Sequence, residues 1–115
     1  MKTLHYTEMD PMPVTVDNVE GVTIRWLIAQ KDGAPNFAMR LFEVAPGGGT
    51  PLHTHDWEHE VFILKGQGVV WKAGEEVPVT EGTAIYVEPK EEHCFKNNGD
   101  SVFQFLCMVP VSAQG

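Results

Sequence analysis

The chain has 115 residues, of which 43% are hydrophobic, and its net charge at pH 7 is −8. This length fits a single domain. The negative charge excludes a typical nucleic-acid binder, whose phosphate partners attract basic patches, and no stretch reaches the roughly 18 apolar residues of a membrane span.

The beginning of the chain and its cysteines predict a cytoplasmic protein. Residues 1–10 lack the apolar segment of a secretory signal peptide. Cys94 and Cys107 offer one possible disulfide, but two reduced thiols are the preferred interpretation for a cytoplasmic chain.

The first 19 residues are expected to form an extended arm or an edge strand. Pro11 and Pro13 cannot donate hydrogen bonds to a sheet, which confines this segment to an edge. The predicted organisation is therefore an N-terminal arm over 1–19, a barrel over 20–110 and a tail over 111–115.

Alternating or short apolar runs, separated by turn signals, predict many short strands. Glycines after Pro46 predict a loop over 46–49, and Ala73-Gly74 predicts a hairpin. No segment has a sustained helical period, so the sequence predicts an all-β sandwich or barrel. The expected strands are 22–28, 37–44, 61–64, 69–71, 76–79, 83–87, 94–96 and 102–109.

Four of the five histidines are spaced as ligands of one metal ion. His53 and His55 would share a face of a strand, because side chains alternate along it. His59 follows four residues later, and His93 lies far along the chain. Imidazole is the commonest protein ligand for metals and suits Zn, Fe, Ni, Cu and Mn. Chance clustering of surface histidines is the less favoured alternative, because the surrounding spacing is also specific.

The spacing around the first three histidines resembles the first cupin motif, G-x5-H-x-H-x3-4-E-x6-G. Gly47 precedes His53 by six residues, and Gly66 closes the motif. The motif normally has glutamate at the position that six residues separate from this glycine, and in this chain that position is His59.

The region around His93 resembles the second cupin motif, G-x5-P-x-G-x2-H-x3-N. Gly82, His93 and Asn97 keep the offsets of that motif. Pro89 lies one place late, and Lys90 occupies the position of the second glycine.

The chain also resembles a narrower group, the small single-domain cupins with a four-histidine manganese site. The segments 35–42, 53–66 and 105–110 carry this similarity. The resemblance implies a cupin jelly-roll β-barrel in a single domain and one divalent metal ion, with manganese favoured. Iron, zinc and nickel also fit imidazole ligands. The implied ligands are His53, His55, His59 and His93.

Neighbouring strands are expected to supply a pocket beside the metal, because cupin metals lie inside the barrel. Alternation places Phe105 and Cys107 on one face of the last strand. Met39 is expected to help them wall the pocket. Arg40 is a further candidate that can hold a substrate carboxylate, although an outward position or an acidic partner is the favoured alternative.

These features favour a metal-dependent, oxygen-using enzyme of dioxygenase type that acts on a small organic molecule. Four neutral imidazoles leave the full charge of a divalent ion, and coordination positions free of protein ligands distinguish catalytic from structural sites. The alternative is a non-catalytic binder or sensor in which the metal anchors a small molecule. A homodimer is expected, with the arm lying along a sheet edge of the partner.

Overall fold

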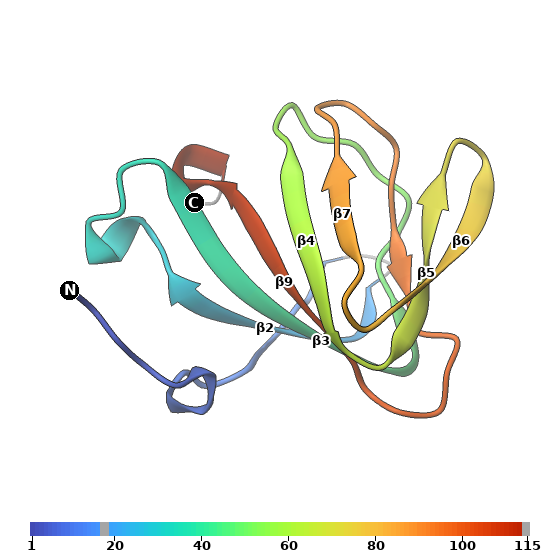
Figure 1. The fold of residues 1–115 in the computed structure, drawn as a ribbon, viewed down its shortest axis with the longest axis horizontal. Helices are drawn as coiled ribbons and strands as arrows, with labels where there is room; N and C mark the ends of the chain where they lie inside the picture. The colour runs from blue at the N-terminus through green and yellow to red at the C-terminus, as the bar shows by residue number, and fades with distance from the viewer. Residues whose placement is uncertain (17–18, 114–115) are drawn as a thin grey trace.

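The computed structural model describes residues 1–16 and 19–113, whose strands form one antiparallel sheet that curls on itself (Figure 1). The predicted all-β fold is confirmed. In the described residues, no helix is long and apolar enough to cross a membrane. The strands are β1 (Met12–Pro13), β2 (Glu20–Ile28), β3 (Phe37–Gly49), β4 (His59–Lys65), β5 (Gln67–Lys72), β6 (Glu75–Thr80), β7 (Ala84–Val87), β8 (Phe95–Lys96) and β9 (Phe103–Pro110), and the 3-10 turns are η1 (Tyr6–Glu8), η2 (Gln30–Asp32) and η3 (Val111–Ala113).

Strand β3 organises the sheet, because it pairs with β2, β8 and β9. From β3 the order continues through β9 and β4 to β7 on one side and through β8 and β5 to β6 on the other. Registration across the strands sets Arg40 opposite both Trp26 and Cys107. Since opposed residues point to the same face, these three side chains share one side of the sheet.

The core lies inside the curl, where alternate residues of the long strands meet. Phe103, Val44 and Ile63 have no exposed surface. Phe105 stacks on Phe42 and Phe95 at centroid distances of 5.4 and 4.9 Å. Each such buried side chain contributes about 1.5–3 kcal/mol by leaving water, so the aromatic residues both stabilise the curled sheet and form the floor of the interior.

The prediction of a loop over 46–49 is wrong, since β3 continues to Gly49. The register with β2 shifts from Val22–Val44 to Glu20–Gly49, which makes an irregular, bulged continuation of the strand. Gly48 permits this path, because a Cβ atom there would lie 2.5 Å from the carbonyl oxygen of Glu20. Glycine therefore allows close pairing of two backbones at this point.

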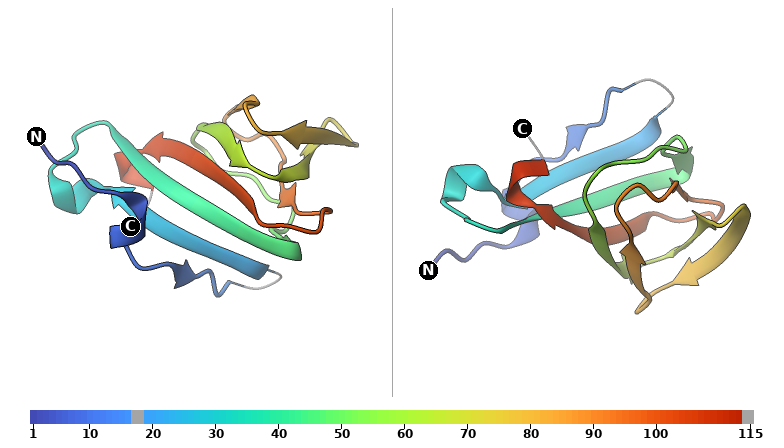
Figure 2. Two further views of the ribbon diagram at one scale, coloured as in Figure 1. Left: turned by 60° about the horizontal axis from the view of Figure 1, so that its bottom comes forward. Right: turned by 90° about the horizontal axis from the view of Figure 1, so that it is seen from above.

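The described part of the N-terminal arm folds against its own chain. β1 pairs antiparallel with β2 through Met12–Ile24 and Pro13–Thr23. The views in Figure 2 show the arm running alongside β2 at the edge of the sheet. The arm thus occupies an edge, as its prolines predict, but that edge belongs to the same molecule. Residues 17–18 of the predicted arm and 114–115 of the predicted tail lie outside the described residues.

Candidate metal centre

Two distant segments bring the histidines together. His53 and His93 form an isolated β-bridge, with N–H···O distances of 3.1 and 3.0 Å in the two directions. His55 lies in the irregular segment that follows this bridge, and His59 is the first residue of β4. The strand expected through His53 and His55 is therefore reduced to one bridge. The centroids of their two rings are nevertheless only 4.5 Å apart.

The four imidazole rings form one cluster. Ligand nitrogens of His53, His55 and His93 all lie within 4.8 Å of one another. The ring of His59 lies beside this group, with its centroid 4.9 Å from that of His55 and 5.0 Å from that of His93. The structure thus shows a compact group of three histidines that can hold a divalent ion, with the fourth at its side.

Hydrogen bonds at the Nδ1 atoms of two histidines fit a role in binding a metal through Nε2. Nδ1 of His53 lies 2.7 Å from the carbonyl oxygen of Pro51, and Nδ1 of His93 lies 2.8 Å from that of Glu91. A carbonyl only accepts, so both Nδ1 atoms carry the proton and both Nε2 atoms keep a lone pair. Metal-bound histidines commonly have such a backbone partner.

The Nε2 atoms of His59 and His93 are both buried without a hydrogen-bond partner. Orphaned polar atoms inside a protein are costly and call for an explanation. A metal ion at the centre of the cluster would supply the missing partner for the Nε2 lone pair of His93, and for that of His59 when the His59 proton lies on Nδ1 beside Cys107. The residues therefore fit the metal that the sequence implies.

The surroundings of His55, His59 and His93 keep these three histidines neutral. Burial lowers the pKa of His59 to about 3 and that of His55 to about 4, and neighbouring positive groups add to the effect. Burial also lowers the pKa of His93. All three imidazoles are therefore uncharged at neutral pH, which is the form that binds a metal.

The histidines line a mainly apolar cavity of about 370 Å³. Phe105 and Cys107 lie in its wall, and so does Arg40, for which the sequence favoured an outward position or an acidic partner. Met39 is absent from the lining and its predicted place there is wrong. Arg40 and Phe42 occupy the cavity face of β3, so alternation turns Met39 to the other side. The lining consists of Val14, Val16, Val19, Arg40, Phe42, Thr50, Pro51, His53, His55, His59, His93, Phe95, Phe105 and Cys107.

Cys107 connects Arg40 to the histidine cluster. Its Sγ lies 2.9 Å from Nη2 of Arg40 and 3.1 Å from Nδ1 of His59. Burial raises the pKa of Cys107, with Arg40 acting in the opposite direction. Cys94 is buried and does not line the cavity, and both cysteines are free thiols.

Sequence reasoning missed two contributions to the site. The ring of Trp57 stacks on that of His55, with centroids 4.6 Å apart and planes 5° apart. An aromatic residue two places after a ligand is a signal that could have suggested this support. Val14, Val16 and Val19 bring the arm over the cavity. No local pattern marks that contact, because it depends on how the chain returns along β2.

The departure from the second cupin motif has a visible structural counterpart. Lys90, at the position of the motif's glycine, has a φ of +68°, a left-handed conformation that glycine adopts more easily. Its N–H donates to the carbonyl oxygen of His55 at 2.5 Å. This bond ties the turn at Lys90 to His55 without a glycine at that position.

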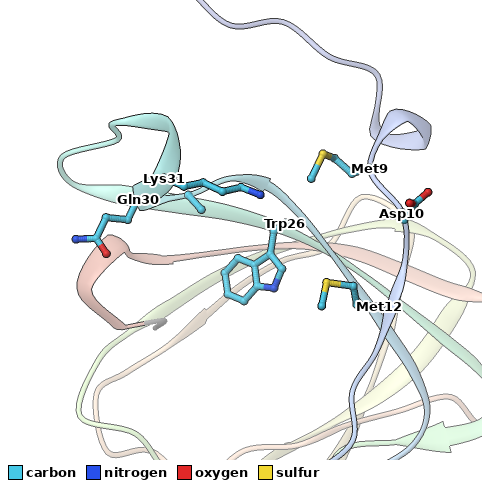
Figure 3. Close-up of a pocket in the computed structure, with 7 residues that line it drawn as sticks. Met9, Asp10, Met12, Trp26, Gln30 and Lys31 are labelled. Atoms are coloured by element: carbon cyan, nitrogen blue, oxygen red, sulfur yellow. The ribbon is translucent and has the colours of Figure 1, made fainter.

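A second hollow lies between the arm and the end of β2 (Figure 3). Met9 and Met12 face Trp26 across it, and Lys31 lies at its rim. It encloses about 500 Å³ but contains no histidine or cysteine. The histidine cavity is consequently the better candidate for chemistry.

Comparisons with known proteins agree with this geometry. Residues 40–109 match the model of the cupin domain family. The oxalate-binding protein of Thermotoga maritima is 34% identical over 74 residues, which cover 61% of each chain. The 1-methylthio-D-xylulose 5-phosphate methylsulfurylase of Rhodospirillum rubrum is 35% identical over 71 residues, which cover 62% of this chain but 46% of the relative. The alignments thus span less than two thirds of these two relatives.

A solved structure extends the similarity to the whole chain. The polyketide cyclase RemF of Streptomyces resistomycificus superposes with a TM-score of 0.94 and 33% identity, covering 100% of this chain and 82% of the cyclase. The family match covers more than half of the chain and includes all four histidines. The chain belongs to the cupin domain family.

Proposed function

We propose that this cupin is a metal-dependent enzyme that acts on a small organic molecule, with His53, His55, His59 and His93 as the metal ligands. The observation that carries the proposal is the pair of buried Nε2 atoms, on His59 and His93, that have no partner in the wall of the cavity. Manganese is favoured by the resemblance to four-histidine cupins, and iron, zinc and nickel suit the same donors.

A bound divalent ion would act as a Lewis acid toward an oxygen atom of the substrate. The protein's own part is to hold and shield that substrate. Phe42, Phe95 and Phe105 supply apolar surface, and the described lining contains no aspartate or glutamate. The ligand set is neutral, so the protein leaves the charge of the ion uncompensated.

The reaction class is proposed in two forms. In the first, oxygen is a second reactant, since a site with coordination positions free of protein ligands can accept both a substrate and dioxygen. In the second, an organic substrate rearranges or closes a ring without oxygen. The similarity to the polyketide cyclase of Streptomyces resistomycificus along the full chain favours the second form.

A non-catalytic role is the alternative from a different class. The relative from Thermotoga maritima is named for oxalate binding. In this alternative, the same cavity holds a metal and a small acid without converting it.

Metal analysis combined with oxygen uptake separates these cases. The protein is purified without oxygen, its metal content is measured, and candidate substrates are added in an oxygen-electrode cell. Consumption of oxygen with a substrate supports the first form, and product formation without uptake supports the second. Ligand binding without any product supports the binder. A protein that takes up no divalent metal contradicts all three.

A further inference from the structure

Arg40 places a positive charge inside the cavity without a carboxylate partner. The ion pairs among the described residues are Lys2–Asp32, Arg25–Glu43 and Lys96–Glu76, and none includes Arg40. The cavity lining in the same residues has no acidic side chain. A buried or half-buried charge normally has a partner of opposite sign, so this cation needs an explanation.

The contacts that Arg40 does make orient it but leave it unsatisfied. Nη2 donates to Cys107 Sγ at 2.9 Å, and the guanidinium lies over the rings of Trp26 and Phe42 at 5.4 and 5.0 Å. A sulfur atom and aromatic faces are weak substitutes for an anion. Nε is buried and has no hydrogen-bond partner. The side chain is thus fixed in position while retaining capacity to donate.

Arg40 is also close to the candidate metal centre. Its Nη2 lies 3.5 Å from Nδ1 of His59, and both residues line the same cavity. The protein as a whole carries a charge of −8. Its cavity nevertheless presents a cation, neutral imidazoles and apolar walls, a combination that selects an anion with an apolar body.

We propose that Arg40 is a specificity-determining residue that binds a carboxylate group of the substrate beside the histidine cluster. The substrate class is then a small organic carboxylate whose apolar part packs on Phe42 and Phe105. This inference deepens the proposed function, on which it rests for the role of the cavity. It adds the charge and the chemical group that the cavity recognises.

Benzoate and its neutral analogue benzamide form a matched pair of probes, because they differ in charge but hardly in shape. Each is titrated calorimetrically into the wild-type and Arg40→Gln proteins, with manganese added and with metal removed. We expect Arg40→Gln to weaken benzoate binding about tenfold or more, as for a lost hydrogen bond to a charged group, while benzamide binding stays unchanged. Arg40→Lys keeps the charge without the planar fork and should lose less.

Arg25→Gln is the control, since it removes the same charge from a neighbouring strand but from a residue outside the cavity lining. Equal benzoate binding by wild type and Arg40→Gln, or an equal loss for benzamide, would overturn the inference. So would a wild-type protein that does not bind benzoate at millimolar concentration. Thermal unfolding checks that Arg40→Gln folds. If that variant does not fold, Arg40→Lys takes its place in the benzoate and benzamide titrations. The titrations without metal test the role of Arg40 alone. Metal content, measured separately, tests the proposed function, so failure of one proposal can be told from failure of the other.

Discussion

At the scale of single residues, His59 decides what kind of cupin this is. It stands where the family motif has glutamate, so the ligand set that we propose has no negative charge. Its Nδ1 lies against Cys107 and its Nε2 is buried without a partner. Glu58 and Glu60 on either side are exposed, which agrees with strand alternation and leaves His59 as the inward group.

Replacing His59 with alanine should abolish stoichiometric metal retention, because the change removes a ligand while leaving three. The measurement is the metal content of the dialysed protein by elemental analysis. His5→Ala is the matched control, since His5 is exposed on the arm and hydrogen-bonds only locally to Thr7. Full metal occupancy in His59→Ala would show that His59 is not a ligand.

Asn97, the last residue of the second motif, acts through structure. It is 2% exposed, and its Nδ2 donates to the carbonyl oxygens of Val44 and Ser101 at 2.8 and 2.7 Å. Asn97→Ala removes both hydrogen bonds from a buried position and should lower the free energy of unfolding by about 2–3 kcal/mol. Denaturant titration measures the change. The exposed neighbour supplies the control, Asn98→Ala, and equal effects in the two variants would refute this role.

At the scale of elements, β3 and β9 together build the cavity. Their register sets Arg40 opposite Cys107 and Phe42 opposite Phe105. Alternation alone predicted that Phe105 and Cys107 share a face, and the structure places both in the cavity wall. Met39 was misplaced because the pairing of β3 with β9 decides which alternate residues of β3 face the cavity. The sequence of β3 alone does not carry that information.

The turn between β4 and β5 depends on Gly66. Its φ is +80°, and a Cβ atom there would clash with the carbonyl oxygen of Val102. Gly66→Ala should cost about 3 kcal/mol or more, from left-handed strain plus displaced backbone. Gly74→Ala is the control, because Gly74 has a φ of +87° with nothing within 4 Å of its Cβ position. Thermal unfolding compares the two, and equal costs would show that the contact with Val102 is unimportant.

The local sequence therefore predicted the histidines of the candidate site better than the residues that surround them. The histidine spacing marked all four rings that line the cavity, because family motifs fix positions in chain order. The covering valines of the arm, the support of His55 by Trp57 and the bulged course of β3 near Gly48 arise from contacts between distant segments. No periodic pattern records such contacts.

At the scale of the whole molecule, the acidic exterior contrasts with a cavity that lacks acidic residues. This separation allows the interior to attract an anion even though the chain has a charge of −8. Closure of the sheet produces the contrast, since it turns Arg40 and the histidines inward while the acidic side chains beside His59 point outward.

The expected homodimer remains a prediction, and the structure changes the surface that we expect it to use. The described arm pairs with its own β2. The outer face of β4 and β7 exposes Phe62 and Tyr86, at 42% and 57%. We predict a dimer through this face, visible as a dimeric mass in sedimentation at micromolar concentration. Phe62→Glu should give monomers, whereas Phe37→Glu, a change at another exposed phenylalanine, should not. A monomeric wild type would contradict the prediction.

The central claim is that four histidines hold one metal ion, and an anomalous difference map tests it most directly. The crystal is grown with manganese and measured at a wavelength where manganese scatters anomalously. The account predicts a single peak within bonding distance of Nε2 of His53, His55, His59 and His93. A peak bound by the other three histidines alone, with His59 left against Cys107, or no peak among the rings, would contradict it.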